Sequence, residues 1–394
     1  MHYYTSVNLN YFAKARVLAK SVKAHNPDAY FSCVLYDDIP PEIKIEDEPF
    51  DEIVTVADLH LPMENVNLWL YQHNTVELGT AIKGQALLDF LQRSDKVAYI
   101  DPDIVVYDNL HALEELLDTY SCVVTPHQLE PETDAFAIEG NEMGSMLRGT
   151  YNFGFYAANN SESGIKFATW FRDRLLTHCF DDVPNGLFTD QRWGNLAPAM
   201  FDNVCIWRHP GCNVSTWNLT HRHVTKTADG KYFVNGEPLL FYHFSGFDSG
   251  AQLEMLKMFG KGNPVLLDMR NWYIEQQKEA GQELYQNWKS KYNYYTDGSK
   301  IEQDERTLLR HSEFLQKTFA KNNPYDKKDG QPSYYEWYVA NHAQWVETDE
   351  KSIKSDHERV IALTAELERI YNSRSWKMMK PFWKISHWFK SEKS

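Results

Sequence analysis

Apolar and polar residues alternate in short blocks over the first hundred positions of the chain. The segment Tyr11–His25 carries apolar residues at helical spacing, and Ala81–Leu91 also predicts a helix. Four short apolar segments predict buried strands: Tyr3–Val7, Tyr30–Tyr36, Ile53–Val56 and Lys96–Ile100. The order strand, helix, strand, strand, helix, strand is typical of an α/β domain with a mostly parallel sheet, whose ligands bind at the carboxyl ends of strands.

The same alternation continues to about residue 265 and then changes. Further apolar runs (NFGFYAA, VCIW and PLLFYHF) alternate with helices predicted over Ile165–His178 and Gln191–Ala199. Residues 268–292 predict a polar helix, and residues 295–356 are rich in Lys, Asp, Gly, Asn and Gln. We therefore expect a main domain over 1–265, a helical and irregular extension with a linker over 266–354, and a separate C-terminal segment over 355–394.

The C-terminal segment combines a helix with a basic, aromatic tail. Ser355–Tyr371 carries a helical apolar stripe, and Arg374–Ser394 holds six basic residues against the single acidic Glu392. On a helical wheel the tail places apolar residues opposite lysines, a pattern typical of helices that lie on anionic membranes. The alternative is a terminal helix docked on an acidic patch of the same protein, and Pro381 would kink either helix.

Composition narrows the class of protein and its surroundings. The 394 residues contain 40 Lys+Arg and 55 Asp+Glu, a net charge of −15, which argues against general nucleic-acid binding. No run reaches the ~18 apolar residues of a membrane helix, and the first residues lack a signal-peptide core. The five cysteines show no C-x-x-C spacing, which suits a reducing compartment. We expect a cytoplasmic protein that is peripheral on the cytoplasmic face of the inner membrane; a homo-oligomer is compatible with the sequence.

Candidate metal ligands lie at the ends of two predicted strands. Asp101 and Asp103 follow the strand Lys96–Ile100, and a turn there can direct both carboxylates to one Mn²⁺ or Mg²⁺ ion. His243 ends the apolar run LLFYH and is a competent third ligand. Small residues, Ser245–Gly246, follow it and would let a phosphate approach the backbone. The alternatives are a chance D-x-D triplet in an acidic protein and a structural histidine.

Polar residues in three further segments are candidates for contacts with a sugar. Asn152 and Gly154 interrupt an apolar strand, where the alternative is a β-bulge. Asp190 and Gln191 begin a predicted helix, where the alternative is helix capping. Trp217 lies among amides, Asn213 and Asn218, and an aromatic ring with amides is typical of carbohydrate sites. Trp217 fits a place in the core equally well.

These segments, taken in order, resemble the retaining GT-A glycosyltransferases of family 8, which include bacterial lipopolysaccharide galactosyltransferases and glycogenin. The resemblance runs from about residue 3 to about 250. The segments that carry it are YFAKARVLAKSV at 11–22, DKVAYIDPDIVVYDNL at 95–110, Asn152–Phe153–Gly154, Asp190–Gln191 and His243. It implies a GT-A type, Rossmann-like mixed sheet flanked by helices, with the C-terminal helical extension beyond it.

The resemblance also implies a role for each matching residue. Asp101, Asp103 and His243 would hold Mn²⁺ or Mg²⁺, and the ion would bind the diphosphate of a nucleotide sugar. Tyr11 would stack on the base, and Gln191 would lie near the anomeric carbon. An amide oxygen is a poor nucleophile, so we favour a front-side path with retention of configuration. The expected donor-binding residues are Asn8, Tyr11, Lys83, Asn152, Gly154, Asp190, Gln191, Trp217, Asn218, Ser245 and Gly246.

Two departures from the family pattern affect the donor site. The family usually has an acid at the position of Asn8, where it recognises uracil. Its H-x-x-G-x-x-K-P-W ends here as HFSGFDSG, without the lysine that holds the diphosphate. A cation must offset that charge, and we expect Lys83 to do so, with Arg222 in reserve. The alternative for Lys83 is an exposed lysine on a helix.

The implied function is transfer of a hexose from a nucleotide diphosphate sugar to a glycan or lipid-linked acceptor. A UDP-sugar is the expected donor, and synthesis of a bacterial surface polysaccharide or lipopolysaccharide is the expected context. Two alternatives remain open. One is a metal-dependent nucleotide-sugar hydrolase or pyrophosphorylase, and the other is a non-catalytic scaffold that binds sugars.

Overall fold

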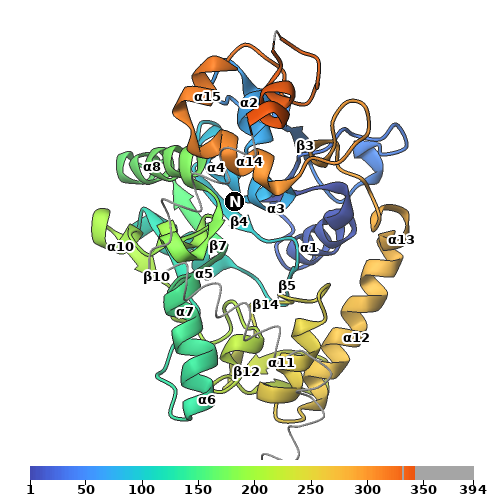
Figure 1. Ribbon diagram of the computed structural model, residues 1–394. Coiled ribbons are helices and arrows are strands. Elements are labelled where there is room, and N and C mark those ends of the chain that lie inside the picture. Colours follow the sequence, from blue (N-terminus) through green and yellow to red (C-terminus); the bar gives the residue numbers. More distant parts are fainter. Residues whose placement is uncertain (331, 342–394) are drawn as a thin grey trace, which may run out of the picture. The chain divides into compact units, whose positions relative to one another are not determined.

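A seven-stranded mixed sheet forms the centre of the molecule (Figure 1). The structure is a computed structural model that describes residues 1–330 and 332–341. Met1–Ser333 form one compact unit. The sheet has the strand order β10-β6-β7-β4-β1-β2-β3. Its strands are β1 (His2–Val7), β2 (Tyr30–Leu35), β3 (Glu52–Thr55), β4 (Lys96–Ile100), β6 (Cys122–Pro126), β7 (Tyr151–Asn159) and β10 (Val204–Ile206). An α/β fold with a mixed, helix-flanked sheet is therefore confirmed.

Strand directions follow the expectation of a mostly parallel sheet. Strands β3, β2, β1 and β4 run parallel to one another, as do β6 and β10. Strand β7 runs antiparallel to both of its neighbours, β4 and β6. The bounds of β4 are those predicted from the sequence, whereas β6 falls in a segment for which no strand was predicted.

The chain order creates a crevice beside β1. After β1 the chain passes through α1 (Phe12–His25) to β2 and β3, and it then returns to pair β4 with the other side of β1. Connections that leave neighbouring strands in opposite directions open a crevice at the carboxyl ends of those strands. Asn8 follows β1 and Asp101 follows β4, so both lie at this crevice.

Helices cover the two faces of the sheet because side chains of a strand alternate between them. Tyr3 packs in one core cluster with α1 and α5 (His111–Thr119). Tyr4 points to the other face, where its ring contacts Phe90 of α4 (Lys83–Leu91). Helix α8 (Glu162–His178) packs closely on α4, since a Cβ at Gly84 would lie 2.7 Å from the Cα of Arg172.

A second layer closes the crevice from the other side. Strand β14 (Phe241–His243) pairs antiparallel with β5 (Ile104–Val106). A small sheet of β11 (Val224–Lys226), β12 (Tyr232–Val234) and β13 (Glu237–Pro238) shares a core with α11 (Ala251–Phe259) and α12 (Pro264–Glu279). Other short elements of the chain include α6 (Ala135–Ala137), the π-helix η4 (Ile138–Glu142), α7 (Met143–Arg148), β8 (Asp181–Asp182) and β9 (Leu187–Phe188).

Two predicted helices are each divided in the structure. The helix expected over Gln191–Ala199 is α9 (Gln191–Gly194) followed by α10 (Ala197–Met200). The polar helix expected over 268–292 is α12 followed by α13 (Gln282–Tyr285), with Gly281 between them at φ 87°. A left-handed glycine ends a helix readily, which explains the second break.

Helices α14 (Gln303–His311) and α15 (Glu313–Thr318) pack on the segment that holds α2 (Val66–Tyr71) and α3 (Thr75–Ala81). Buried Arg306 donates hydrogen bonds to the carbonyls of Tyr71 and His73, and Arg310 binds both carboxylate oxygens of Glu77 at 3.0 Å. The predicted helix Ser355–Tyr371 and the basic tail lie outside the described residues. Among helices of residues 1–330 and 332–341, none has the length and apolarity needed to cross a bilayer.

Candidate active site

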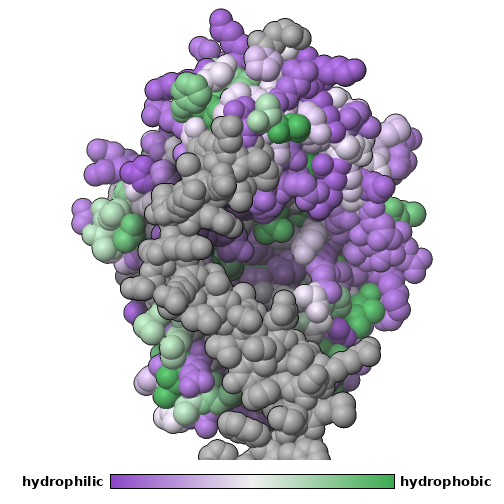
Figure 2. Space-filling model, in the orientation of Figure 1, coloured by the Kyte–Doolittle hydropathy of each residue, from purple (hydrophilic) through white to green (hydrophobic). Residues whose placement is uncertain are grey.

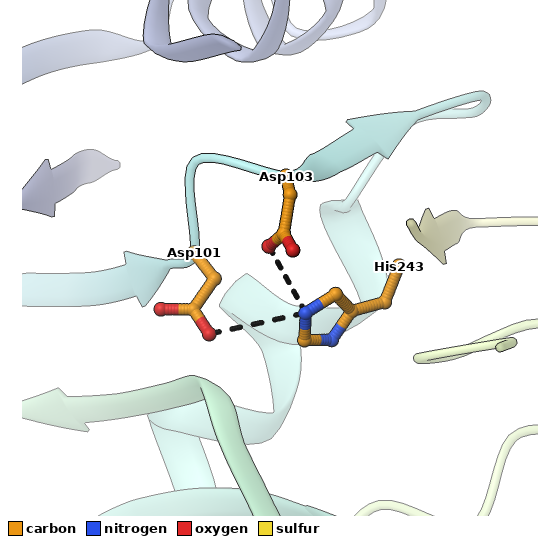
Figure 3. A group of neighbouring side chains, drawn as sticks. All are labelled: Asp101, Asp103 and His243. Carbon is orange, nitrogen blue, oxygen red and sulfur yellow. Dashed lines mark ion pairs between the residues drawn. The ribbon is translucent and has the colours of Figure 1, made fainter. Parts of the chain in front are cut away.

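Two carboxylates and one imidazole meet at the carboxyl end of β4 (Figure 3). Asp101 follows β4, Asp103 precedes β5, and His243 ends β14. The pairing of β14 with β5 sets His243 opposite Ile104, next to Asp103. His243 Nε2 lies 3.0 Å from Asp103 Oδ1 and 3.9 Å from Asp101 Oδ2, and the ligand atoms all lie within 4.8 Å of one another. The predicted ligands therefore converge.

The negative carboxylates and the positive imidazole of this group stabilise each other's charged forms. Burial raises the pKa of Asp103, but the neighbouring His243 and then Lys14 outweigh it and lower that pKa. Burial lowers the pKa of His243, and the two aspartates outweigh it and raise that pKa. A divalent cation between the carboxylates would take the place of the imidazole proton. Two hard oxygen ligands and one imidazole nitrogen suit Mn²⁺ or Mg²⁺, so the residues fit the expected ion.

An amide network orients the imidazole. Asn213 Nδ2 donates to Thr125 Oγ1 and Asn152 Oδ1, so Asn213 Oδ1 faces His243 Nδ1 at 3.1 Å. This arrangement puts the imidazole proton on Nδ1 and leaves Nε2 for an ion. Asn152 Nδ2 in turn donates to His127 Nε2, and burial lowers the pKa of His127 to about 4, which keeps that ring neutral.

Strand β7 must pass very close to the ligands. A Cβ at Gly154 would lie 2.6 Å from Asp101 Oδ2 and 2.7 Å from His243 Cε1. Only glycine leaves room for the three side chains to meet. The backbone of Gly154 also holds the group, since its N–H donates to Asn152 Oδ1 and its carbonyl accepts from the Asp101 N–H.

Lys83 links the metal group to the predicted sugar site. Its Nζ lies 3.2 Å from Asp101 Oδ1 and 2.9 Å from Asp190 Oδ2. Burial lowers the pKa of Lys83, but the two carboxylates outweigh it and raise that pKa. Burial raises the pKa of Asp190, and Lys83 opposes that shift. Lys83 is thus a buried, shared cation, and the alternative of an exposed lysine is wrong.

A cavity of about 610 Å³ opens beside these groups. In Figure 2 a recess near the centre of the view is lined mainly by hydrophilic surface. The cavity walls include all three predicted metal ligands. They also include most of the predicted donor-binding residues: Asn8, Tyr11, Lys83, Asn152, Gly154, Asp190, Gln191, Trp217 and Ser245.

Four residues singled out in the sequence lie outside the cavity wall: Gly246, Asn218, Arg222 and Asn213, of which Asn213 supports His243. Gly246 follows Ser245 with φ 72°. The amide of Asn218 is bonded to the backbone of His127, Asn213 and Ser215, which is a structural role. Arg222 is buried elsewhere and donates to the Cys212 carbonyl.

Gln191 is held at both ends of its amide. Its Oε1 accepts from the Phe153 N–H at 3.3 Å, and its Nε2 donates to the Arg148 carbonyl at 3.1 Å. Thr189, two residues earlier, adopts φ 45°, a strained value for a β-branched residue. Such strain is often stored at functional sites, and here it sets Asp190 facing Lys83.

Two aromatic residues and one amide of the cavity wall are available for contacts with a ligand. Tyr11 is 37% exposed. Trp217 packs edge-on against His243, with ring centroids 5.3 Å apart, and its indole N–H has no partner among the described residues. Asn8 Oδ1 is likewise buried and unpartnered within the described part of the chain. Buried polar atoms of this kind are satisfied by a ligand or water.

Several residues of the site could not be identified from the sequence. His127 and Arg148 line the cavity, and Asn213 supports His243, yet none of them belongs to a local motif. The weak signal for Asn213 was its place beside Trp217, which suggested a sugar contact instead. Lys14 is the least expected, because helical periodicity places it on α1 without indicating that its ammonium group is buried.

Known proteins similar to this chain fall into two groups. No protein-family model matches the chain. It is 31% identical to the uncharacterized protein YfnF of Bacillus subtilis (strain 168) over 164 residues, which cover 41% of this chain and 53% of YfnF. The chain thus matches about half the length of that relative. It is 23% identical to the uncharacterized protein YfnD of the same organism over 297 residues, which cover 70% of this chain and 90% of YfnD.

Two solved structures with similarity to the chain are glycosyltransferases. The galactosyltransferase LgtC, in complex with donor and acceptor sugar analogs, is 18% identical and has a TM-score of 0.38, over 62% of this chain and 87% of LgtC. The glycosyltransferase GlyE of Streptococcus pneumoniae TIGR4 is 18% identical with a TM-score of 0.35, over 55% of this chain and 46% of GlyE. Neither Bacillus relative has an assigned activity, so function must be inferred from the site itself.

Proposed function

We propose that this chain is a metal-dependent glycosyltransferase. It moves a hexose from a nucleotide diphosphate sugar, with a UDP-sugar expected, to a glycan or lipid-linked acceptor of a bacterial surface polysaccharide or lipopolysaccharide. The observation that carries the proposal is the convergence of Asp101, Asp103 and His243 at one wall of a cavity that also holds Asp190 and Gln191. This set combines a cation site with polar groups suited to a sugar.

The metal group suits a departing diphosphate. A divalent ion held by Asp101, Asp103 and His243 would offset the negative charge that builds on the leaving group. The protein's own part is to hold the donor. Tyr11 offers an exposed ring for the base, and the unpartnered Asn8 Oδ1 can accept a hydrogen bond from an N–H of that base.

The sugar end of the cavity is preorganised. Lys83 holds the carboxyl group of Asp190 at 2.9 Å, where its oxygens can accept hydrogen bonds from sugar hydroxyls. The Gln191 amide is immobilised by two backbone hydrogen bonds, and its neutral oxygen is weakly nucleophilic. Both features favour retention by a front-side path, in which the acceptor proton passes to the departing phosphate. No glutamine adduct is then needed.

Two other functions would use some of the same residues. A nucleotide-sugar hydrolase or pyrophosphorylase would also need the ion, but water or phosphate would take the place of the acceptor. A sugar-binding scaffold needs neither the carboxylate pair nor the buried Lys83–Asp190 contact. Burying these charged groups is energetically costly, so their presence favours an enzyme that uses them over a scaffold that does not.

The test is a panel of nucleotide sugars incubated with the full chain and Mn²⁺, with release of each free nucleotide as the readout. We expect one donor to stand out, and addition of the correct acceptor should divert the sugar from water to a glycoside. Free sugar as the sole product, even with saturating acceptors, would favour the hydrolase. Absence of turnover with every donor would favour the scaffold.

The variant Asp103→Ala should abolish turnover and Mn²⁺-dependent nucleotide binding while the circular dichroism spectrum is retained. Asp28→Ala is the matched control, because Asp28 is exposed and forms no ion pair among the described residues. Full activity of the Asp103 variant would refute the metal assignment.

A further inference from the structure

A second buried lysine, besides Lys83, lies close to the candidate active site. Lys14 of α1 is 1% exposed, and its Nζ lies 2.5 Å from Asp248 Oδ2. Asp248 belongs to the segment that follows β14 and its side chain is 48% exposed. The ion pair therefore joins a buried ammonium group to a carboxylate that remains in contact with water.

Lys14 lies beside the predicted base site, and its charge acts on the metal group. Its Nζ is 4.1 Å from the ring centroid of Tyr11, which lines the cavity. Its charge also reaches Asp103: burial raises the pKa of that carboxyl, and His243 and Lys14 lower it. Lys83, in contrast, contacts Asp101 and Asp190. The two buried lysines of the described chain thus contact different residues of the cavity wall: Lys14 lies over Tyr11, and Lys83 contacts Asp101 and Asp190.

The charge balance of a bound donor calls for a cation at this place. A diphosphate ester brings two negative charges, and the ion that receives it already has two carboxylate ligands. Lys83 shares its single charge between one of those ligands, Asp101, and the further carboxylate of Asp190. Arg148 also lines the cavity, but it belongs to α7, whereas Lys14 lies beside Tyr11 and its charge acts on Asp103. A cation there offsets charge that would otherwise be buried unpaired, which is costly.

We propose that Lys14 binds the diphosphate of the donor, and that Asp248 holds this ammonium group until the donor arrives. The inference rests on the proposed function. Asp248 can leave because water solvates its half-exposed carboxylate, while the diphosphate takes its place beside the buried ammonium group. Lys14 keeps an anionic oxygen partner before and after the exchange.

Two glycines in the left-handed region flank the segment that carries Asp248. Gly246 at φ 72° and Gly250 at φ 78° stand on either side of it, and glycine adopts such values without strain. Ser245, immediately before the first glycine, lines the cavity. The carboxylate thus sits between two permissive backbone positions next to the site.

The alternative is an ion pair that only fastens this segment to α1. The two roles differ in the sign of one effect. If the pair is structural, removing either partner loosens the segment and weakens donor binding. If Asp248 competes with the diphosphate, removing Asp248 strengthens binding, whereas removing Lys14 weakens it.

The experiment is calorimetric titration of the full chain with Mn²⁺ alone, and with Mn²⁺ plus each of UDP, GDP, ADP, CDP and dTDP. Lys14→Met should weaken binding of the preferred nucleotide about ten- to a hundredfold, as expected for loss of a charge-assisted hydrogen bond. Its affinity for Mn²⁺ alone should stay the same or rise, because a cation near Asp103 is removed. Asp248→Asn should bind the nucleotide more tightly, and Lys20→Met is the control, since Lys20 is an exposed lysine of the same helix.

The outcomes separate this inference from the proposed function. Unchanged nucleotide affinity in Lys14→Met, or weaker binding in both variants, would overturn the role of Lys14 while leaving the glycosyltransferase proposal intact. Failure of the wild-type chain to bind every nucleoside diphosphate with Mn²⁺ would overturn both.

Discussion

At the scale of single residues, the ability of the site to bind metal depends on the tautomer of His243. Asn213 determines it, since Asn213 Oδ1 can only accept a hydrogen bond, and it faces Nδ1 at 3.1 Å. Asn213 itself adopts φ 51°, which glycine tolerates. The substitution Asn213→Gly therefore removes the side chain without straining the backbone.

We predict that Asn213→Gly lowers Mn²⁺ affinity about ten- to a hundredfold, as is usual when a residue that orients a ligand is lost. Isothermal titration calorimetry measures the effect. Asn235→Gly is the matched control, because Asn235 adopts φ 53° and is exposed in the turn after β12. Equal affinities in the two variants would show that Asn213 does not support the ligand.

Some residues of this site could be predicted from the sequence and others could not, depending on whether their role follows from local sequence or from distant contacts. Asp101, Asp103 and His243 could be predicted because each stands at the end of an apolar run, and strand ends meet at one edge of a sheet. Asn213 and Lys14 could not, because their roles depend on which distant segment packs against them. No local pattern records that Lys14 meets Asp248, more than two hundred residues away.

At the scale of elements, the path of β7 past the metal group is the tightest constraint. We predict that Gly154→Ala abolishes Mn²⁺ binding, because its Cβ would occupy the space between Asp101 and His243. Thermal unfolding of the variant should show that the fold persists at a reduced melting temperature. Full Mn²⁺ affinity of a folded Gly154→Ala protein would contradict the close approach.

The extension supports one wall of the cavity through a buried ion pair. Arg310 of α14 binds Glu77 of α3, with side chains 4% and 2% exposed. Thr75 and Thr80 of the same helix line the cavity. Arg310→Met leaves the Glu77 carboxylate buried and unpaired, so the free energy of unfolding in urea should fall by about 3–5 kcal/mol.

A control for that prediction is available on the surface. Lys278→Met removes an exposed partner of Glu275 and should change the free energy of unfolding by less than about 1 kcal/mol. If the Arg310 and Lys278 variants unfold alike, the extension does not stabilise this wall.

Elements were easier to predict than their ends. The runs YFSCVL and KVAYI give strands because all their residues except Ser32 and Lys96 are apolar or aromatic, and both faces of the sheet are covered. The helix expected over Gln191–Ala199 breaks before Ala197, because Pro198 in the first turn of α10 has no backbone N–H with which to continue a helix from α9. The antiparallel direction of β7 could not be predicted, because it depends on which distant strands pair with β7 and not on the residues of β7 itself.

At the scale of the whole molecule, charge is distributed unequally along the chain. The segment Arg374–Ser394 carries six basic residues and one acidic residue, although the complete chain has a net charge of −15. We predict that deleting this segment releases the protein from vesicles that contain anionic lipid, without loss of transfer to a soluble acceptor. Vesicle sedimentation measures the first effect. Equal sedimentation of the full and truncated chains would contradict a membrane role for the tail.

The central claim is that one divalent ion, held by Asp101, Asp103 and His243, receives the diphosphate of the donor. The most direct measurement is anomalous diffraction from crystals of the full chain grown with Mn²⁺ and its preferred nucleoside diphosphate. We predict a single manganese peak bonded to the three side chains and to phosphate oxygens. A bound nucleotide whose phosphates meet no ion at these side chains would contradict the account.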